Sequence, residues 1–140
     1  MSDPDHKTRD ASCACGRLTV SVIGEPEIVS VCNCTACQRR TGSVFGTSAY
    51  FDKTQLVSVI GDIKTFQRGS DSGRTLSMHF CPECGSTVYW ELAMYPDLAG
   101  VAVGCFADPD FTPPQRAVWT DKQHHWVQFP DEMNSFPKAP

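Results

Sequence analysis

Apolar and polar residues alternate over short stretches of the chain. In residues 15–24, Leu18, Val20 and Val22 alternate with polar neighbours, and this period of two predicts a strand that buries one face. Glycine and proline residues separate such stretches and predict turns between them. Short strands joined by turns indicate an all-β fold. We expect further strands in residues 27–34, 44–51, 55–61, 63–67, 75–80, 86–92, 100–106 and 117–120.

Helical patterns are scarce in this sequence. Residues 35–43, "TACQRRTGS", predict a short helical turn that opens at Thr35 and stops at Gly42. Residues 68–74, "RGSDSGR", predict a polar turn. The polar residues 1–11 predict a flexible tail, and residues 12–137 a single domain. Five prolines between residues 109 and 137 argue against much regular structure in that segment.

Composition and charge narrow the possible partners. The chain has 140 residues, of which 41% are hydrophobic and 20% charged, as in ordinary globular proteins. Its formal net charge of −4 argues against nucleic acid or an anionic membrane as a partner. We see no apolar run long enough to span a membrane. The N-terminal residues lack the apolar stretch of a signal peptide, so we expect a cytoplasmic protein.

Cysteine is the residue type that carries candidate chemistry. The chain has eight cysteines, and without a secretion signal metal ligation explains them better than disulfides. Seven of them lie in three close groups, whose spacing suits ligands that share one ion. The groups are C-x-C at 13–15, C-x-C-x-x-C at 32–37 and C-x-x-C at 81–84, and the eighth cysteine is Cys105.

The segment "FCPECG" at residues 80–85 has the form of a zinc knuckle. A C-x-x-C pair can also be a redox pair, but that function needs a βαβ context that the pattern does not predict. A structural zinc needs a second cysteine pair, and spacing alone would allow Cys32 and Cys34 to supply it. We favour the pair at 13–15, so that the predicted structural site consists of Cys13, Cys15, Cys81 and Cys84.

The remaining group, Cys32, Cys34 and Cys37, then forms a second site with three protein ligands. Three ligands and one exchangeable position are typical of catalytic zinc, and a site rich in thiolates suits a further thiol as ligand. The alternative is that Cys105 completes this site and both ions are structural. A lone cysteine in an alternating apolar strand is, however, more typical of a packed core.

The order of these motifs resembles a known family. C-x-C-G, then C-x-C-x-x-C followed by "RRTGS", then F-C-P-x-C-G and "GCFADP", resemble the glutathione-dependent formaldehyde-activating enzymes, whose domain centromere protein V shares. The resemblance covers residues 13–136. It implies a β-tent fold of small twisted antiparallel sheets. It also implies two zinc ions per chain, a structural one on Cys13, Cys15, Cys81 and Cys84 and a catalytic one on Cys32, Cys34 and Cys37.

The resemblance also implies a reaction, namely the addition of glutathione to formaldehyde to give S-(hydroxymethyl)glutathione, which is classed as a carbon–sulfur lyase activity. The expected partners are therefore a glutathione-like thiol and a small aldehyde. The thiol would occupy the open position of the second zinc and attack the aldehyde carbon as a thiolate. Arg39, Arg40 and Thr41 are the nearest groups in sequence that could hold the new alkoxide or a substrate carboxylate, although two such arginines can equally be a solvated surface pair.

Two positions depart from the family pattern, and both bear on the substrate. Asn33 and Ala117 stand where many members have histidine. Neither is a ligand in the predicted sites, so we expect these changes to alter the pocket rather than the metals. The competing hypothesis is a non-catalytic zinc-binding module that serves interaction. The two hypotheses differ in whether the fourth position of the second metal is open to a thiol.

Overall fold

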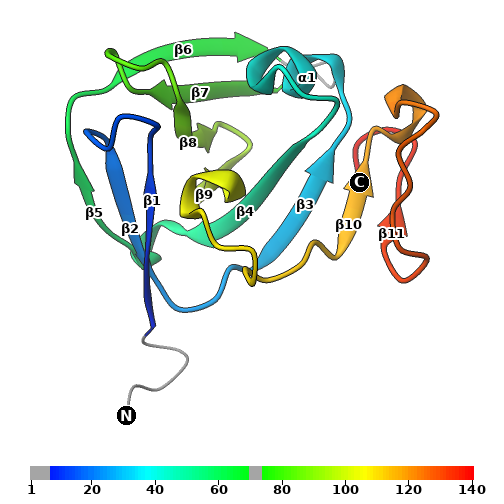
Figure 1. Cartoon of the computed structure of the whole chain (residues 1–140), viewed down its shortest axis with the longest axis horizontal. Helices are drawn as coiled ribbons and strands as arrows, with labels where there is room; N and C mark the ends of the chain where they lie inside the picture. Colours follow the sequence, from blue (N-terminus) through cyan, green and yellow to red (C-terminus); the bar gives the residue numbers. More distant parts are fainter. Residues whose placement is uncertain (1–6, 70–73) are drawn as a thin grey trace.

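The computed structural model describes residues 7–69 and 74–140, and its strands form two sheets (Figure 1). The smaller sheet has the strand order β1-β2-β5, and both of its pairings are antiparallel. Its strands alternate as predicted, since Val20 and Val22 of β2 are buried between half-buried neighbours. The bounds are β1 (Thr8–Ser12), β2 (Thr19–Ile23) and β5 (Leu56–Ile60).

The larger sheet has the strand order β11-β10-β3-β4-β9-β8-β7-β6. Most of its pairings are antiparallel, but β10 runs parallel to both β3 and β11. The all-β prediction is therefore confirmed, with a mixed rather than purely antiparallel second sheet. The bounds are β3 (Ile28–Cys32), β4 (Gly46–Asp52), β6 (Lys64–Gly69), β7 (Thr75–Phe80), β8 (Thr87–Leu92), β9 (Tyr95–Ala102), β10 (Arg116–Val118) and β11 (Asn134–Ser135).

Two predicted segments differ from the structure. Residues 8–11, which we expected in a flexible tail, belong to β1 because they pair with β2 and because Ala11 is fully buried. The predicted strand at 100–106 ends at Ala102, and a 3-10 helix, η3 (Val103–Phe106), follows. Cys105 therefore lies in a 3-10 helix and not in a strand. Residues 1–6 of the predicted tail and 70–73 of the predicted turn lie outside the described residues.

The main core lies where the smaller sheet meets the larger one. Leu18, Val20 and Val22 pack there with Phe51 and Val88, and all five are fully buried. A second, smaller cluster of Met78, Trp90 and Ala102 lies along β7, β8 and β9. Met78 and Trp90 of this cluster also line the cavity described below. The strands thus bury one set of side chains for stability and turn another set toward a pocket.

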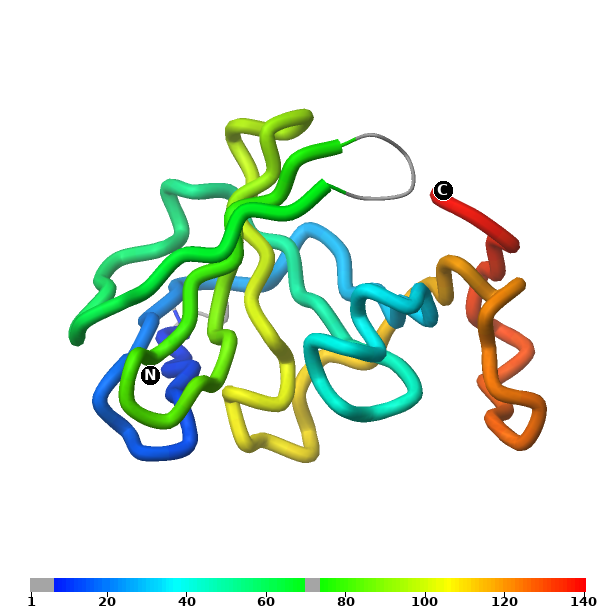
Figure 2. Tube along the Cα trace, turned by 90° about the horizontal axis from the view of Figure 1, so that it is seen from above, coloured from blue at the N-terminus to red at the C-terminus, as the bar shows by residue number. Residues whose placement is uncertain are grey.

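Two connections position the cysteines. β3 ends at Cys32, and helix α1 (Thr35–Thr41) begins within three residues and stops at Gly42, which adopts a left-handed conformation with φ 70°. The segment after β10 lies beside α1 (Figure 2), where Gln38 Nε2 donates to the carbonyl of Lys122 at 3.2 Å. Short 3-10 helices η2 (Lys53–Gln55) and η4 (Thr120–Lys122) complete the elements. None of the helices in the described ranges is long and apolar enough to span a membrane.

Candidate metal centre and adjoining cavity

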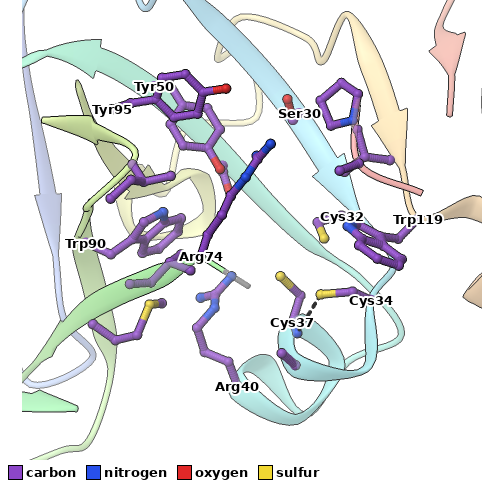
Figure 3. Close-up of a pocket in the computed structure, with 18 of the residues that line it drawn as sticks. Ser30, Cys32, Cys34, Cys37, Arg40, Tyr50, Arg74, Trp90, Tyr95 and Trp119 are labelled. Atoms are coloured by element: carbon purple, nitrogen blue, oxygen red, sulfur yellow. Dashed lines mark hydrogen bonds between the residues drawn. The ribbon is translucent and has the colours of Figure 1, made fainter. Parts of the chain in front are cut away.

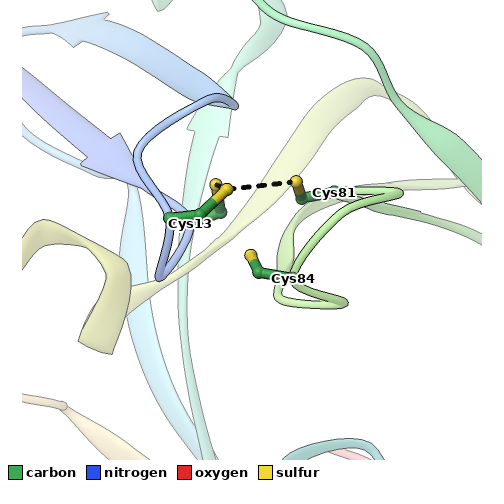
Figure 4. Close-up of side chains that lie close together, drawn as sticks. Cys13, Cys81 and Cys84 are labelled. Carbon is green, nitrogen blue, oxygen red and sulfur yellow. Dashed lines mark hydrogen bonds between the residues drawn. The ribbon is translucent and has the colours of Figure 1, made fainter.

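The first cysteine cluster joins two turns that are far apart in sequence (Figure 4). All four sulfur atoms lie within 4.8 Å of one another, with Cys13 Sγ 3.6 Å and Cys81 Sγ 3.7 Å from Cys15 Sγ. Gly16 and Gly85 follow the two pairs with φ near 80°, which lets the chain turn tightly after each pair. The structure thus brings together the pairs that we favoured from spacing: Cys13, Cys15, Cys81 and Cys84.

The second cluster forms where β3 passes into α1. The sulfur atoms of Cys32, Cys34 and Cys37 lie within 4.8 Å of one another. Cys34 caps the helix, since its sulfur accepts a hydrogen bond from the backbone N–H of Cys37 at 3.4 Å. Cys37 is buried, while Cys32 and Cys34 are partly buried. The end of β3 and the first turn of α1 therefore bring three thiols close enough to bind one metal ion.

The electrostatics of this cluster favour charge on Cys34. Hydrogen bonds from the thiols of Cys32 and Cys37, assisted by the Cys37 backbone N–H and the positive charge of Arg68, lower the pKa of Cys34. The hydrogen bond to Cys34 raises the pKa of Cys32 in turn. These contacts therefore favour the thiolate form of Cys34, the residue that caps the helix.

Cys105 does not complete this second cluster. Its thiol donates a hydrogen bond to the carbonyl oxygen of Thr87 at 3.8 Å, and burial raises its pKa. It packs against both apolar clusters of the core. Among the described residues, no histidine, carboxylate or further cysteine joins the three sulfur atoms. The geometry thus favours core packing for Cys105, as we expected, although in a 3-10 helix.

A cavity of about 390 Å³ opens beside the second cluster (Figure 3). All three cysteines line it, together with four aromatic side chains, Tyr50, Trp90, Tyr95 and Trp119. Burial raises the pKa of the Tyr50 phenol, so its hydroxyl stays protonated and can donate. No aspartate or glutamate lies among the described residues of the lining. Four arginines line the same cavity: Arg40, Arg68, Arg74 and Arg116.

Of the three substrate-binding candidates after the cysteine cluster, the structure places Arg40 alone in the cavity lining. Arg40 lies three residues after Cys37 and so shares its face of α1, whereas Arg39 points to solvent. Thr41 is used locally, since its hydroxyl donates to the carbonyl of Cys37 at 2.9 Å. The hypothesis of a solvated arginine pair is thus wrong for Arg40, which lines the cavity. It agrees with the exposure of Arg39.

Arg40 is held in a defined position. Its guanidinium lies 4.7 Å from the ring centroid of Trp90, a cation–π contact, and Figure 3 shows it between Trp90 and the cysteines. Its Nε is buried and has no hydrogen-bond partner among the described residues. Gly46 makes room for it, because a Cβ atom there would lie 2.6 Å from Arg40 Nη2.

The two departures from the family pattern lie behind the cavity wall. Asn33 is fully buried, and its Nδ2 donates to the carbonyl of Val118 at 3.0 Å. Ala117 is also fully buried, and neither residue lines the cavity. The expectation that both alter the pocket directly is therefore not supported. Asn33 instead connects the cysteine loop to β10 through its hydrogen bond to Val118. The same strand contains Arg116, which lines the cavity.

Sequence reasoning did not single out the arginines that come from distant strands. Arg68 is the penultimate residue of β6, Arg74 precedes β7, and Arg116 opens β10, so their proximity to Cys34 depends on strand pairing across the larger sheet. Trp90 is buried in β8 and also lines the cavity. No spacing rule links these residues to the cysteines, so a single sequence carries no signal for them.

Comparisons with known proteins bear on the family and on the fold. The family model described as "Glutathione-dependent formaldehyde-activating enzyme" matches residues 8–122. The chain is also similar to a crystal structure of a Rhodobacter sphaeroides protein, with a TM-score of 0.52 and 21% identity over 74% of this chain and 91% of that chain. At this identity the similarity concerns the fold. No curated protein matches the chain.

Proposed function

The chain belongs to the glutathione-dependent formaldehyde-activating enzyme family, and on that premise we propose that it is a zinc enzyme adding a thiol to a small aldehyde. The named version joins glutathione to formaldehyde, a carbon–sulfur lyase reaction. The observation that carries the proposal is the convergence of three thiols on the wall of a cavity, with no fourth side-chain ligand among the described residues. We place the enzyme in the cytoplasm, where thiols stay reduced.

The donor chemistry of both clusters fits zinc. Sets made only of cysteine sulfur, gathered within 4.8 Å, suit a soft tetrahedral ion far better than Mg²⁺ or Ca²⁺. We propose two zinc ions per chain. The four-cysteine cluster would stabilise the fold by joining the turn after β1 to the turn after β7. Zinc on Cys32, Cys34 and Cys37 would supply the lowered pKa that makes a bound substrate thiol reactive at neutral pH.

The side chains of the cavity have separate tasks in the proposed reaction. The thiol loses its S–H proton to solvent, and its sulfur electron pair forms a C–S bond with the carbonyl carbon. The carbonyl π pair moves to oxygen, which takes a proton from solvent to become the hydroxyl. Arg40 is placed to stabilise the negative oxygen, because its guanidinium lies beside the cysteines and its Nε has no partner among the described residues. The Tyr50 hydroxyl is a second donor in the same cavity.

Metal analysis combined with a rate assay tests this proposal. We expect two zinc ions per chain and formation of S-(hydroxymethyl)glutathione faster than the uncatalysed addition, which is itself facile. Cys34→Ser should lose one zinc and the catalysed rate while keeping the fold. Cys105→Ala is the matched control, since that cysteine lies outside both clusters, and it should keep both ions and the rate.

The competing interpretation, a non-catalytic zinc module, predicts a different result in the same experiment. It predicts one tightly held zinc, or two that are equally resistant to a mild chelator, and no rate above the background. That outcome would overturn the proposed enzyme and leave a structural function for both clusters. A second zinc that a mild chelator removes together with activity would support the enzyme.

A further inference from the structure

We propose that Trp119 selects the aldehyde, and that the preferred electrophile is an aldehyde with an apolar side group rather than formaldehyde. The inference rests on the proposed function, because it names the second substrate of the same reaction. It assigns an apolar binding surface to Trp119 together with Leu76 and Leu92. Three observations carry it: the backbone conformation of Trp119, the place of its ring beside the cysteines, and the apolar side chains of the cavity.

The backbone of Trp119 is strained. It has φ 56° and ψ 41°, in the left-handed region that large side chains rarely adopt. Among the described residues, Ala107 is the only other non-glycine residue with a positive φ. Such a conformation costs free energy, persists only where the surroundings enforce it, and is found most often at functional sites.

Neighbouring residues hold Trp119 in this conformation. The carbonyl of Val118 accepts hydrogen bonds from the backbone N–H of Asn33 at 3.1 Å and from Asn33 Nδ2 at 3.0 Å. The N–H of Trp119 donates to the carbonyl of Lys138 at 3.1 Å, and its own carbonyl accepts from the N–H of Lys122 at 3.0 Å. Both polar groups of the peptide between Val118 and Trp119 are therefore fixed, one of them by the loop that contains the cysteines.

This conformation places the indole beside the second cysteine cluster. β10 runs parallel to β3, and Val118 lies opposite Cys32, so Trp119 leaves the sheet next to the first cysteine of the cluster. Figure 3 shows its ring beside Cys32 and Cys34, across the cavity from Trp90. A substrate sulfur at the cluster brings the carbonyl carbon, and any group attached to that carbon, close to the indole.

The cavity adds further apolar surface. Leu76 of β7 and Leu92 of β8 are paired across the sheet, and both are partly exposed and line the cavity. Its volume of about 390 Å³ is in the range of small-molecule sites. A one-carbon aldehyde would leave these side chains in contact with water, whereas a branched alkyl group would remove their surface from water. Glutathione is a polar tripeptide without such a group, so we assign the surface to the aldehyde.

A pair of aldehydes tests the selection. We would measure kcat/KM with glutathione for isovaleraldehyde and for formaldehyde, each divided by the rate constant of the uncatalysed addition. The isobutyl group of isovaleraldehyde is equivalent to a leucine side chain, whose burial corresponds to a factor of about ten to a hundred. The rate enhancement for isovaleraldehyde should exceed that for formaldehyde by about this factor.

Two variants locate the source of the selection. Trp119→Asn removes the indole but keeps the left-handed backbone, which asparagine tolerates. It should lower the ratio of the two enhancements by at least about fivefold. Trp126→Asn is the matched control, because this indole is exposed and lies outside the cavity lining. It should keep the ratio of the parent.

Binding of non-reacting amides separates this inference from the proposed reaction. Isovaleramide should bind the zinc-loaded protein at least about tenfold more tightly than acetamide in an NMR titration, and Trp119→Asn should lose this difference. Selective binding of isovaleramide without any rate above background would support the apolar surface and refute the reaction.

Other outcomes would overturn the inference. Enhancements that are equal for both aldehydes and well above background would refute it while supporting the reaction. Equal binding of the two amides to the unaltered protein would also refute it, even if Trp119→Asn failed to fold. Selectivity that persists in Trp119→Asn with both zinc ions bound would contradict the assignment to Trp119.

Discussion

Gly100→Ala is predicted to destabilise the protein through a single aromatic ring. Gly100 of β9 lies opposite Trp90 of β8. A Cβ atom on Gly100 would lie 2.1 Å from Trp90 Nε1, 2.5 Å from Cε2 and 2.8 Å from Cδ1, all well inside van der Waals contact. The indole is only 2% exposed, and the guanidinium of Arg40 covers it 4.7 Å from its centroid. The ring therefore cannot tilt away without disturbing the cavity wall.

Overpacking of this kind costs about 1–3 kcal/mol, and three contacts with one rigid ring place the expected loss in unfolding free energy at about 3 kcal/mol. For a chain of this length, that corresponds to a fall in Tm of roughly 10 °C. Urea unfolding of the zinc-loaded protein, followed by circular dichroism at fixed zinc concentration, measures the loss. Gly104→Ala is the matched control, because no atom lies within 4 Å of its added Cβ, and it should stay within about 0.5 kcal/mol of the parent.

A double-mutant cycle identifies the cause. In a Trp90→Phe background the pyrrole atoms that meet the new Cβ are gone, so Gly100→Ala should cost less than about 1 kcal/mol there. Two results would refute the reasoning: a loss for Gly100→Ala no larger than that of Gly104→Ala, or the same loss in both backgrounds. The first would show that the sheet absorbs the methyl group, and the second that the cost arises from the backbone.

Three further predictions concern the cavity, the four-cysteine cluster and an exposed ion pair. Gly46→Ala should displace the Arg40 guanidinium from the cysteines and lower kcat/KM several-fold. The free energy of unfolding in urea should stay within about 1 kcal/mol of the parent, because the Arg40 side chain can move. An unchanged kcat/KM would contradict a role for Arg40. Cys81→Ser should remove one zinc and cost about 3 kcal/mol of stability, which lowers Tm by roughly 10 °C. Calorimetry and metal analysis measure both effects, and an unchanged Tm would contradict a structural ion. Hydrogen bonding from Lys53 lowers the pKa of Glu91 in the folded state, so this stabilisation is complete above the ordinary value of 4.5 and is lost as the pH falls through the folded value. Glu91→Gln should therefore flatten the acid limb of the stability–pH curve, and an unchanged limb would contradict the pairing.

Much of the fold could be predicted because most strands obey the alternation of apolar residues. The stretch around Val20 and Val22 became β2, with those side chains in the core. β1 was missed because its sequence, "TRDAS", is polar, and its strand arises from pairing with β2. The strand through Cys105 was overextended because apolar alternation continues past Ala102, whereas the backbone turns into η3 there. Tertiary context, not local pattern, decided both segments.

The candidate site divides in the same way. Local spacing predicted that Cys32, Cys34 and Cys37 form a cluster. All three lie between the end of β3 and the first turn of α1. Spacing alone did not show that Cys13 and Cys15 share a site with Cys81 and Cys84. That prediction rested on the four ligands that a structural zinc needs, and the sulfur positions agree with it. Arg68 and Arg116 could not be found, because their strands, β6 and β10, lie near opposite ends of the larger sheet and only the strand order brings both residues to the cavity. Spacing predicted how the cysteines group, whereas it could not predict which distant side chains line the cavity beside them.

The central claim is that Cys32, Cys34 and Cys37 hold a metal whose fourth position accepts a substrate thiol. The most direct measurement is the absorption of protein loaded with Co²⁺ in place of zinc, titrated with glutathione and, separately, with S-methylglutathione. The account predicts that glutathione strengthens the thiolate-to-cobalt charge-transfer band by one sulfur ligand, that S-methylglutathione does not, and that Cys34→Ser abolishes the change. A spectrum that glutathione leaves unaltered at saturating concentration would contradict the account.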